Sequence, residues 1–262
     1  MDNWQKFEIN CTDYLNEKYG KIAKFTNYGG SNSNVADIIV STKNGNCFGM
    51  EAKLCPAQCG QFVLLPNISN REFDYSAKNF STPTVNTYKI TYHMNKYFDE
   101  YKEAGTSGKE IIFDGCKEVF VNWVIEYYNN KMVKYFITND YTILPIQKFA
   151  EYFNITAIYR VKRSGSSSVG KSDLDVISNY INRNFEITSV TKNGTRLFVE
   201  TNQDMHNTRF MYGKYEYTFS SRDDKYEIRR LSNTFNANVI FSISLISRQS
   251  QEDLQGFENV LR

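Results

Sequence analysis

Residues 36–53 read ADIIVSTKNGNCFGMEAK. The two apolar runs, ADIIV and FGMEAK, predict short strands, and KNGN between them predicts the turn of a hairpin. We expect Asp37 and Glu51 to face each other across this hairpin. Lys53 should share the face of Glu51, because side chains alternate along a strand with a period of two residues. Two carboxylates and an amine at one sheet edge suit a divalent-cation site in which the lysine acts on water or on developing negative charge.

The order of an acid, a gap and Glu-x-Lys resembles the signature of the PD-(D/E)xK nuclease superfamily, most of all that of type II restriction endonucleases. Ala36 stands in place of the proline, which is not a metal ligand. The resemblance implies Mg²⁺, with Mn²⁺ able to substitute, bound by Asp37, Glu51 and the carbonyl of Ala52. It also implies that Lys53 orients or deprotonates the attacking water. On spacing alone, a surface hairpin with ordinary charges is the alternative.

Residues 2–19 predict an amphipathic helix. Its apolar stripe is formed by Trp4, Phe7, Cys11, Tyr14 and Leu15. Glu8 lies on this stripe, where a carboxylate must be desolvated, paired or bound to metal. In the Holliday-junction-resolvase and RecB-like branches of the superfamily, a helical Phe-Glu pair ahead of the first strand supplies an extra acid. The resemblance implies that role for Glu8, as a catalytic and metal-binding residue; a glutamate that reaches water from the stripe edge is the alternative.

Polar segments flank the hairpin on both sides. Before it, GGSNSN at 29–34 allows close approach of a phosphate, and Ser31 and Asn32 are expected to donate hydrogen bonds to DNA; a simple polar turn is the alternative. After it, Gln58 and Gln61 are expected to position water or contact a base edge.

Composition predicts a well-packed chain. The 262 residues are 41% hydrophobic and 15% aromatic, enough for one large domain or a core with a smaller lobe. The five cysteines are odd in number and predict free thiols. A zinc site at Cys55 and Cys59 is disfavoured, because no second cysteine pair follows and both histidines are distant. No secretion signal or long apolar run is present, so we expect a cytoplasmic protein without a membrane span.

The remaining chain predicts an α/β fold, with a mixed central sheet flanked by helices and a β-rich C-terminal part. Helices are expected at 86–101 and 147–153, strands at 110–114 and 156–161, a hairpin at 134–138 with 141–144, and helix or strand at 119–128. Further hairpins are expected at 185–190 with 195–201 and at 215–220 with 226–231, followed by a strand at 238–245. We divide the chain into a catalytic core at 1–165 and a DNA-binding β region at 166–262 that continues the core.

Residues 165–172 read GSSSVGKS and satisfy the P-loop pattern of nucleotide-binding proteins. The strand before them alternates apolar and charged residues, whereas a P-loop strand is apolar throughout. The residues after them predict hairpins rather than βαβ units. We therefore expect contact with a DNA backbone rather than with a nucleotide. The residues assigned to it are Lys162, Arg163, Ser164, Ser166 and Lys171.

These observations predict a Mg²⁺-dependent endonuclease that hydrolyses double-stranded DNA, a type II site-specific restriction enzyme acting as a homodimer. The net charge of +2 gives no support of its own. The alternatives are a repair or structure-specific nuclease similar to Holliday-junction resolvases, a non-catalytic DNA-binding module and a P-loop NTPase. Chain length favours restriction over junction resolution, because resolvases of this type are much smaller.

Overall fold

The computed structural model describes residues 3–29 and 35–262, which form two compact units. Unit 1 comprises Met1–Arg160 and Ala237–Arg262, and unit 2 comprises Val161–Asn236. The division expected at 165/166 differs in two respects, because unit 2 begins at Val161 and ends at Asn236. The last strand and the C-terminal helix belong to unit 1, because that strand pairs with a strand that follows the catalytic hairpin. None of the described helices is long and apolar enough to cross a membrane.

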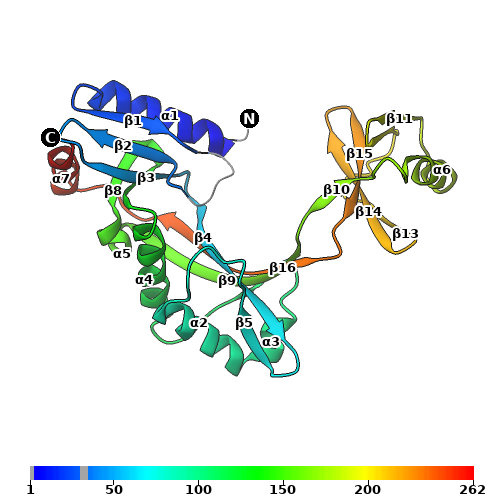
Figure 1. The fold of residues 1–262 in the computed structure, drawn as a ribbon, viewed down its shortest axis with the longest axis horizontal. Coiled ribbons are helices and arrows are strands. Elements are labelled where there is room, and N and C mark those ends of the chain that lie inside the picture. The colour runs from blue at the N-terminus through cyan, green and yellow to red at the C-terminus, as the bar shows by residue number, and fades with distance from the viewer. Residues whose placement is uncertain (1–2, 30–34) are drawn as a thin grey trace. The chain divides into compact units, whose positions relative to one another are not determined.

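The central sheet of unit 1 is mixed, with strand order β1-β2-β3-β7-β8 (Figure 1). The strands are β1 (Ala23–Asn27), β2 (Ile38–Thr42), β3 (Cys47–Lys53), β7 (Val133–Thr138) and β8 (Thr142–Pro145). β3 and β7 run parallel, and the other neighbours run antiparallel. The two predicted hairpins, β2 with β3 and β7 with β8, and the mixed α/β class are confirmed. Strand β1 was not predicted.

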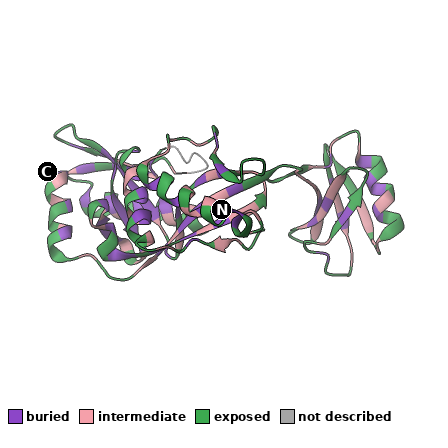
Figure 2. Cartoon of the chain, turned by 90° about the horizontal axis from the view of Figure 1, so that it is seen from below, coloured by how far each residue is buried: buried purple, intermediate pink, exposed green. Residues whose placement is uncertain are grey.

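Helices pack against both faces of this sheet. α1 (Asn3–Tyr19) and α7 (Gln251–Leu261) share a core with one face, and α4 (Cys116–Asn129) packs on the other. Two consecutive residues of β7 show the alternation, since Tyr135 contacts Phe257 of α7 with ring centroids 5.0 Å apart, and Phe136 contacts Tyr128 of α4 at 4.9 Å. Buried residues accordingly concentrate in the strands and on the inward sides of the helices (Figure 2). The ambiguous segment at 119–128 is helical, with its buried residues at helical spacing.

A second sheet of unit 1 has the order β5-β4-β16-β9-β6. Its strands are β4 (Ala57–Asn67), β5 (Glu72–Tyr75), β6 (Lys109–Glu110), β9 (Phe153–Arg163) and β16 (Phe235–Leu245). The helix expected at 86–101 is broken at Tyr97 into α2 (Val85–Lys96) and α3 (Phe98–Lys102). The strand expected at 110–114 ends after Glu110, and the chain turns at Gly115 with a φ of +73° to start α4. The helix expected at 147–153 is a 3₁₀ turn followed by α5 (Phe149–Tyr152).

Unit 2 is an antiparallel sheet with one helix on it. The order is β11-β12-β15-β14-β13, and β10 also pairs with β15. The elements are β10 (Ser166–Ser168), α6 (Leu174–Asn184), β11 (Ser189–Asn193), β12 (Arg196–Glu200), β13 (Arg209–Tyr212), β14 (Tyr215–Arg222) and β15 (Lys225–Leu231). Both predicted hairpins of this region are confirmed. The P-loop-like segment contains β10, which lies in this antiparallel sheet. A P-loop instead joins a strand of a parallel sheet to a helix N-terminus, so the arrangement opposes the NTPase alternative.

Candidate active site

The β2–β3 hairpin brings Asp37, Glu51 and Lys53 together. Asp37 directly precedes β2, which begins at Ile38 rather than at Ala36 as predicted. The backbone N–H of Ala52 donates a hydrogen bond of 3.0 Å to Asp37 Oδ2. Lys53 Nζ lies 2.7 Å from Glu51 Oε1 and 3.5 Å from Asp37 Oδ2. The acid-acid-amine constellation is therefore assembled in the described structure.

Glu51 has one satisfied oxygen and one free oxygen. Its Oε1 accepts hydrogen bonds from Lys53 and, at 3.3 Å, from the Tyr128 hydroxyl. Its Oε2 is buried and has no hydrogen-bond partner among the described residues. An unpaired buried carboxylate oxygen costs free energy, and native structures rarely retain one without a ligand, an ion or water. This oxygen is the first observation that fits a bound cation.

Glu8 reaches the same place from α1. Only 7% of this residue is exposed. Burial and, after it, repulsion from Asp37 raise the pKa of Glu8 from 4.5 to about 7, although Lys53 opposes the shift. Its Oε2 lies so close to Gly29 that a Cβ on that residue would be 2.0 Å away. The glycine ahead of β2 thus provides room for the carboxylate, a role that the phosphate-contact prediction for this segment did not include.

The pKa values of Asp37 and Lys53 are both raised. Burial raises the pKa of Asp37 to about 6; Glu51 adds to the shift, while Lys53 and the Ala52 N–H oppose it. Burial alone would lower the pKa of Lys53, but Glu51 and Asp37 outweigh it and raise that pKa above the ordinary value for lysine. Lys53 therefore stays protonated beside the acids. This state favours donating hydrogen bonds or stabilising charge over deprotonating water.

The acids line a cavity of about 410 Å³ in unit 1. Its wall includes Glu8, Asp37, Glu51, Lys53, Gln58 and Gln61. The two glutamines are joined by a hydrogen bond of 3.1 Å from Gln58 Nε2 to Gln61 Oε1, and Asn238 Nδ2 of β16 donates to the same oxygen at 3.3 Å. Sequence reasoning missed Asn238 because it lies 177 residues from Gln61. Trp4, predicted on the buried stripe of α1, is 43% exposed and lies at the cavity rim.

The donor set fits a hard divalent cation. Carboxylate oxygens and a backbone carbonyl are the ligands that Mg²⁺ prefers. Within the described ranges, no three His, Cys, Asp or Glu side chains are already closed around one point. The neighbouring Cys59 does not add a soft ligand, because burial raises the pKa of its thiol and keeps it neutral. Asp37, Glu51, Ala52 and Glu8 thus remain the candidate ligands.

The other predicted DNA-binding residues come from the segment before β2 and from residues 162–171. Ser31 and Asn32 lie outside the described residues. In unit 2, Lys162 and Lys171 are exposed, whereas Arg163 is ion-paired with Glu216 and donates to the Ser232 carbonyl at 2.9 Å. Ser164 is also engaged within unit 2, through hydrogen bonds to Ser232 and Thr234.

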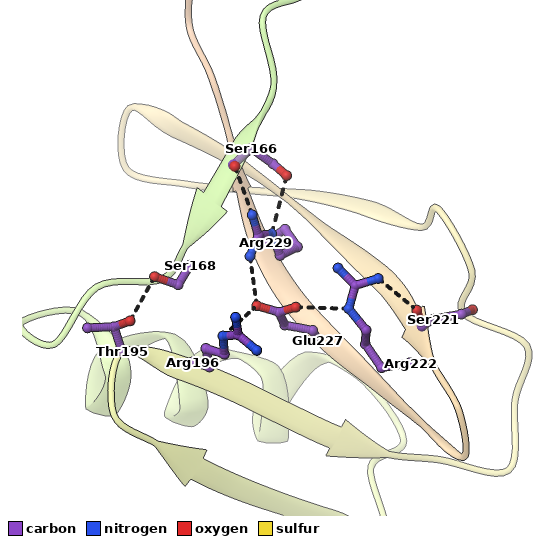
Figure 3. Close-up of polar contacts among 8 residues, drawn as sticks. All are labelled: Ser166, Ser168, Thr195, Arg196, Ser221, Arg222, Glu227 and Arg229. Carbon is purple, nitrogen blue, oxygen red and sulfur yellow. Dashed lines mark hydrogen bonds and ion pairs between the residues drawn. The ribbon is translucent and has the colours of Figure 1, made fainter. Parts of the chain in front are cut away.

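Ser166 belongs to an arginine cluster that surrounds Glu227 (Figure 3). Glu227 is 1% exposed and lies 2.8 Å from Arg229 Nη1, 3.1 Å from Arg222 Nε and 3.8 Å from Arg196 Nε. Arg229 also donates to the Ser166 carbonyl at 2.8 Å. The Arg196 and Arg222 side chains remain more than half exposed. Sequence reasoning missed Glu227, whose signal is a lone acid between apolar neighbours on β15.

Comparison with known proteins agrees with this architecture. The solved structure of the HhaI endonuclease in complex with DNA is 40% identical in sequence to this chain, and the match covers 99% of each chain. The two structures align with a TM-score of 0.80. No family model matches the chain, and no curated protein matches it.

Proposed function

This chain belongs to the restriction endonuclease family of the HhaI endonuclease, and on that premise we propose that it is a Mg²⁺-dependent, type II site-specific endonuclease acting on double-stranded DNA. The observation that carries the proposal is the cavity in which Asp37, Glu51 and Lys53 converge, with the Lys53 amine within hydrogen-bonding distance of both carboxylates. The assembled acid-acid-amine set favours catalysis over a DNA-binding module without activity. The PD-(D/E)xK assignment rests on the same residues.

Each residue of the cavity has a distinct task in hydrolysis. Asp37, Glu51 and the Ala52 carbonyl would hold Mg²⁺, with Glu8 as a further ligand. The ion would supply Lewis-acid activation of the phosphodiester. Lys53, kept protonated by the two acids, orients the attacking water and stabilises negative charge on the phosphate. The Tyr128 hydroxyl donates a hydrogen bond to Oε1 of Glu51, while Oε2 has no partner and would be available to a cation.

Unit 2 is proposed to contact the DNA backbone. Exposed guanidinium groups bind phosphates well when their orientation is fixed beforehand. Glu227 fixes three arginines while its own charge is already neutralised, so the cluster retains a net positive charge. Lys162 and Lys171 add exposed cations to the same unit. Such contacts would add affinity without reading sequence.

Cleavage of plasmid DNA tests the proposal. Wild-type protein should cut DNA of mixed sequence at discrete sites with Mg²⁺ or Mn²⁺ and not with EDTA, and Lys53→Ala should reduce the rate by at least about 10²-fold. Lys43→Ala, in the exposed turn of the same hairpin, is the matched control. Undiminished cleavage by the Lys53 variant would refute the assigned site. Cutting confined to branched DNA would favour the junction-resolving alternative. The predicted homodimer stays a prediction, which sedimentation velocity with and without DNA tests.

A further inference from the structure

A further lysine, Lys131, lines the same cavity as the acids. It lies between the end of α4 and the start of β7, and no sequence motif points to it. Only 9% of the residue is exposed. Lysines are rarely so buried unless a carboxylate pairs with them, so this placement calls for a physical reason.

The amine of Lys131 has aromatic neighbours but no polar partner. Its Nζ lies 4.1 Å from the ring centroid of Tyr127 and 5.3 Å from that of Tyr128. Among the described residues it forms neither a hydrogen bond nor an ion pair. Burial lowers the pKa of the amine, and repulsion from Lys53 adds to the shift, while attraction to Glu51 and Asp37 opposes it. Cation–π contact holds an ammonium group in place but does not satisfy its N–H donors.

Charge balance indicates which ligand those donors serve. The cavity is lined by three carboxylates, Glu8, Asp37 and Glu51, and by two lysines besides Lys131, namely Lys53 and Lys78. Fully ionised, this set is neutral, and one divalent cation gives it two positive charges. A phosphodiester supplies a compensating negative charge together with oxygen acceptors for the N–H donors of Lys131.

We propose that Lys131 donates hydrogen bonds to a DNA phosphate in the active-site cavity, as a further cation beside Lys53. The two lysines differ in their surroundings. Lys53 is neutralised by direct ion pairs with Glu51 and Asp37, whereas Lys131 rests on aromatic rings that leave its charge available to a new anion. This inference rests on the proposed nuclease function and assigns a residue that the motif does not contain.

Two substitutions separate charge from packing. Lys131→Met retains an unbranched apolar side chain against Tyr127 but removes the charge, and Lys131→Arg retains the charge. Lys134→Met, an exposed position on β7, is the matched control. Binding of a DNA duplex is measured in Ca²⁺ over a range of NaCl concentrations, and cleavage is measured in Mg²⁺.

Lys131→Met should weaken binding about tenfold and reduce the slope of log K against log[salt] by about one, because one phosphate contact is lost. Lys131→Arg should preserve most of the affinity and of the salt slope, and Lys134→Met should change neither quantity. An unchanged affinity and salt slope in Lys131→Met would overturn the proposal. A wild-type protein that neither binds nor cuts DNA would instead refute the proposed function.

Acetylation of the wild-type protein needs no variant and covers the case in which Lys131→Met does not fold. Mass spectrometry follows the labelling of Lys131 and Lys134 with and without DNA. Bound DNA should lower the acetylation rate of Lys131 at least about fivefold more than that of Lys134, because the phosphate occupies the amine of Lys131. Equal labelling of Lys131 in the free and bound states would contradict the proposal.

Discussion

Glu8→Gln should stabilise the metal-free protein at alkaline pH while it impairs DNA cleavage. In the folded protein, burial and Asp37 raise the pKa of Glu8 from 4.5 to about 7. A shift of one pKa unit corresponds to 1.36 kcal/mol, so ionising Glu8 in the folded state costs about 3 kcal/mol more than in the unfolded chain. Glutamine cannot ionise and avoids this cost, although burying its amide without hydrogen-bond partners lowers the stability of the folded protein by about 1 kcal/mol. The expected net gain above pH 8 is about 2 kcal/mol.

The pH dependence fixes the sign of the effect. Between pH 4.5 and 7 the unfolded chain has released the proton of Glu8 while the folded protein still holds it, so the free energy of unfolding falls as pH rises. Asp37, with its pKa raised to about 6, contributes in the same direction in both proteins. The difference between variant and wild type therefore reports Glu8 together with its repulsion from Asp37. It should grow by about 2–3 kcal/mol from pH 5 to pH 8.5.

Urea unfolding in EDTA at these two pH values measures the effect. Glu17→Gln, at an exposed position of the same helix, serves as the control and should show no such growth. Adding Mg²⁺ should raise the stability of the wild type more than that of Glu8→Gln, because the variant has lost a ligand. A difference between Glu8→Gln and wild type that is independent of pH would refute the reasoning that Glu8 is a desolvated carboxylate at the metal site.

Two further substitutions test other contacts. Gly29→Ala places a Cβ 2.0 Å from Glu8 Oε2 and should lower the cleavage rate about tenfold by displacing that carboxylate. Gly256→Ala, whose Cβ would have no atom within 4 Å, should leave the rate unchanged. Equal cleavage rates for Gly29→Ala and wild type would show that the position of Glu8 does not matter for cleavage. Glu227→Gln leaves arginines facing one another without a counter-ion and should lower the free energy of unfolding, measured in urea, by about 2 kcal/mol. Glu200→Gln should change that free energy little, because the ion pair of Glu200 with Lys225 is exposed.

The parts of the site that could be predicted are those whose positions depend on residue spacing along a short stretch of chain. The period of two along β3 places Glu51 and Lys53 on one face, and the turn between β2 and β3 brings Asp37 to them. The helical spacing that put Glu8 on the apolar stripe of α1 likewise determines its burial. Each of these relations spans fewer than about 20 residues, so chain geometry alone is enough to specify it.

The remaining parts depend on contacts that no local pattern records. Lys131 reaches the acids because β7 pairs in parallel with β3, and a parallel pairing is set by the packing of the helix between the strands rather than by a turn. Strand β16 returns to unit 1 beside β4 after the whole of unit 2, which placed Asn238 next to Gln61 and made the linear division at 165/166 fail. Glu227 was missed for a similar reason, since its arginines come from three different strands or strand ends.

The two motifs of this chain differ in what they require from their surroundings. An acid-acid-lysine set requires only that two adjacent strands pair in register, which the hairpin itself ensures. A P-loop requires a parallel sheet that carries the phosphate loop to the start of a helix. In residues 165–172, the strand Ser166–Ser168 pairs instead in an antiparallel sheet, and the helix starts at Leu174. A short motif therefore predicts a function only when the sequence also specifies the structure that the motif requires around it. For Asp37, Glu51 and Lys53 that context is local, and for the P-loop pattern it is not.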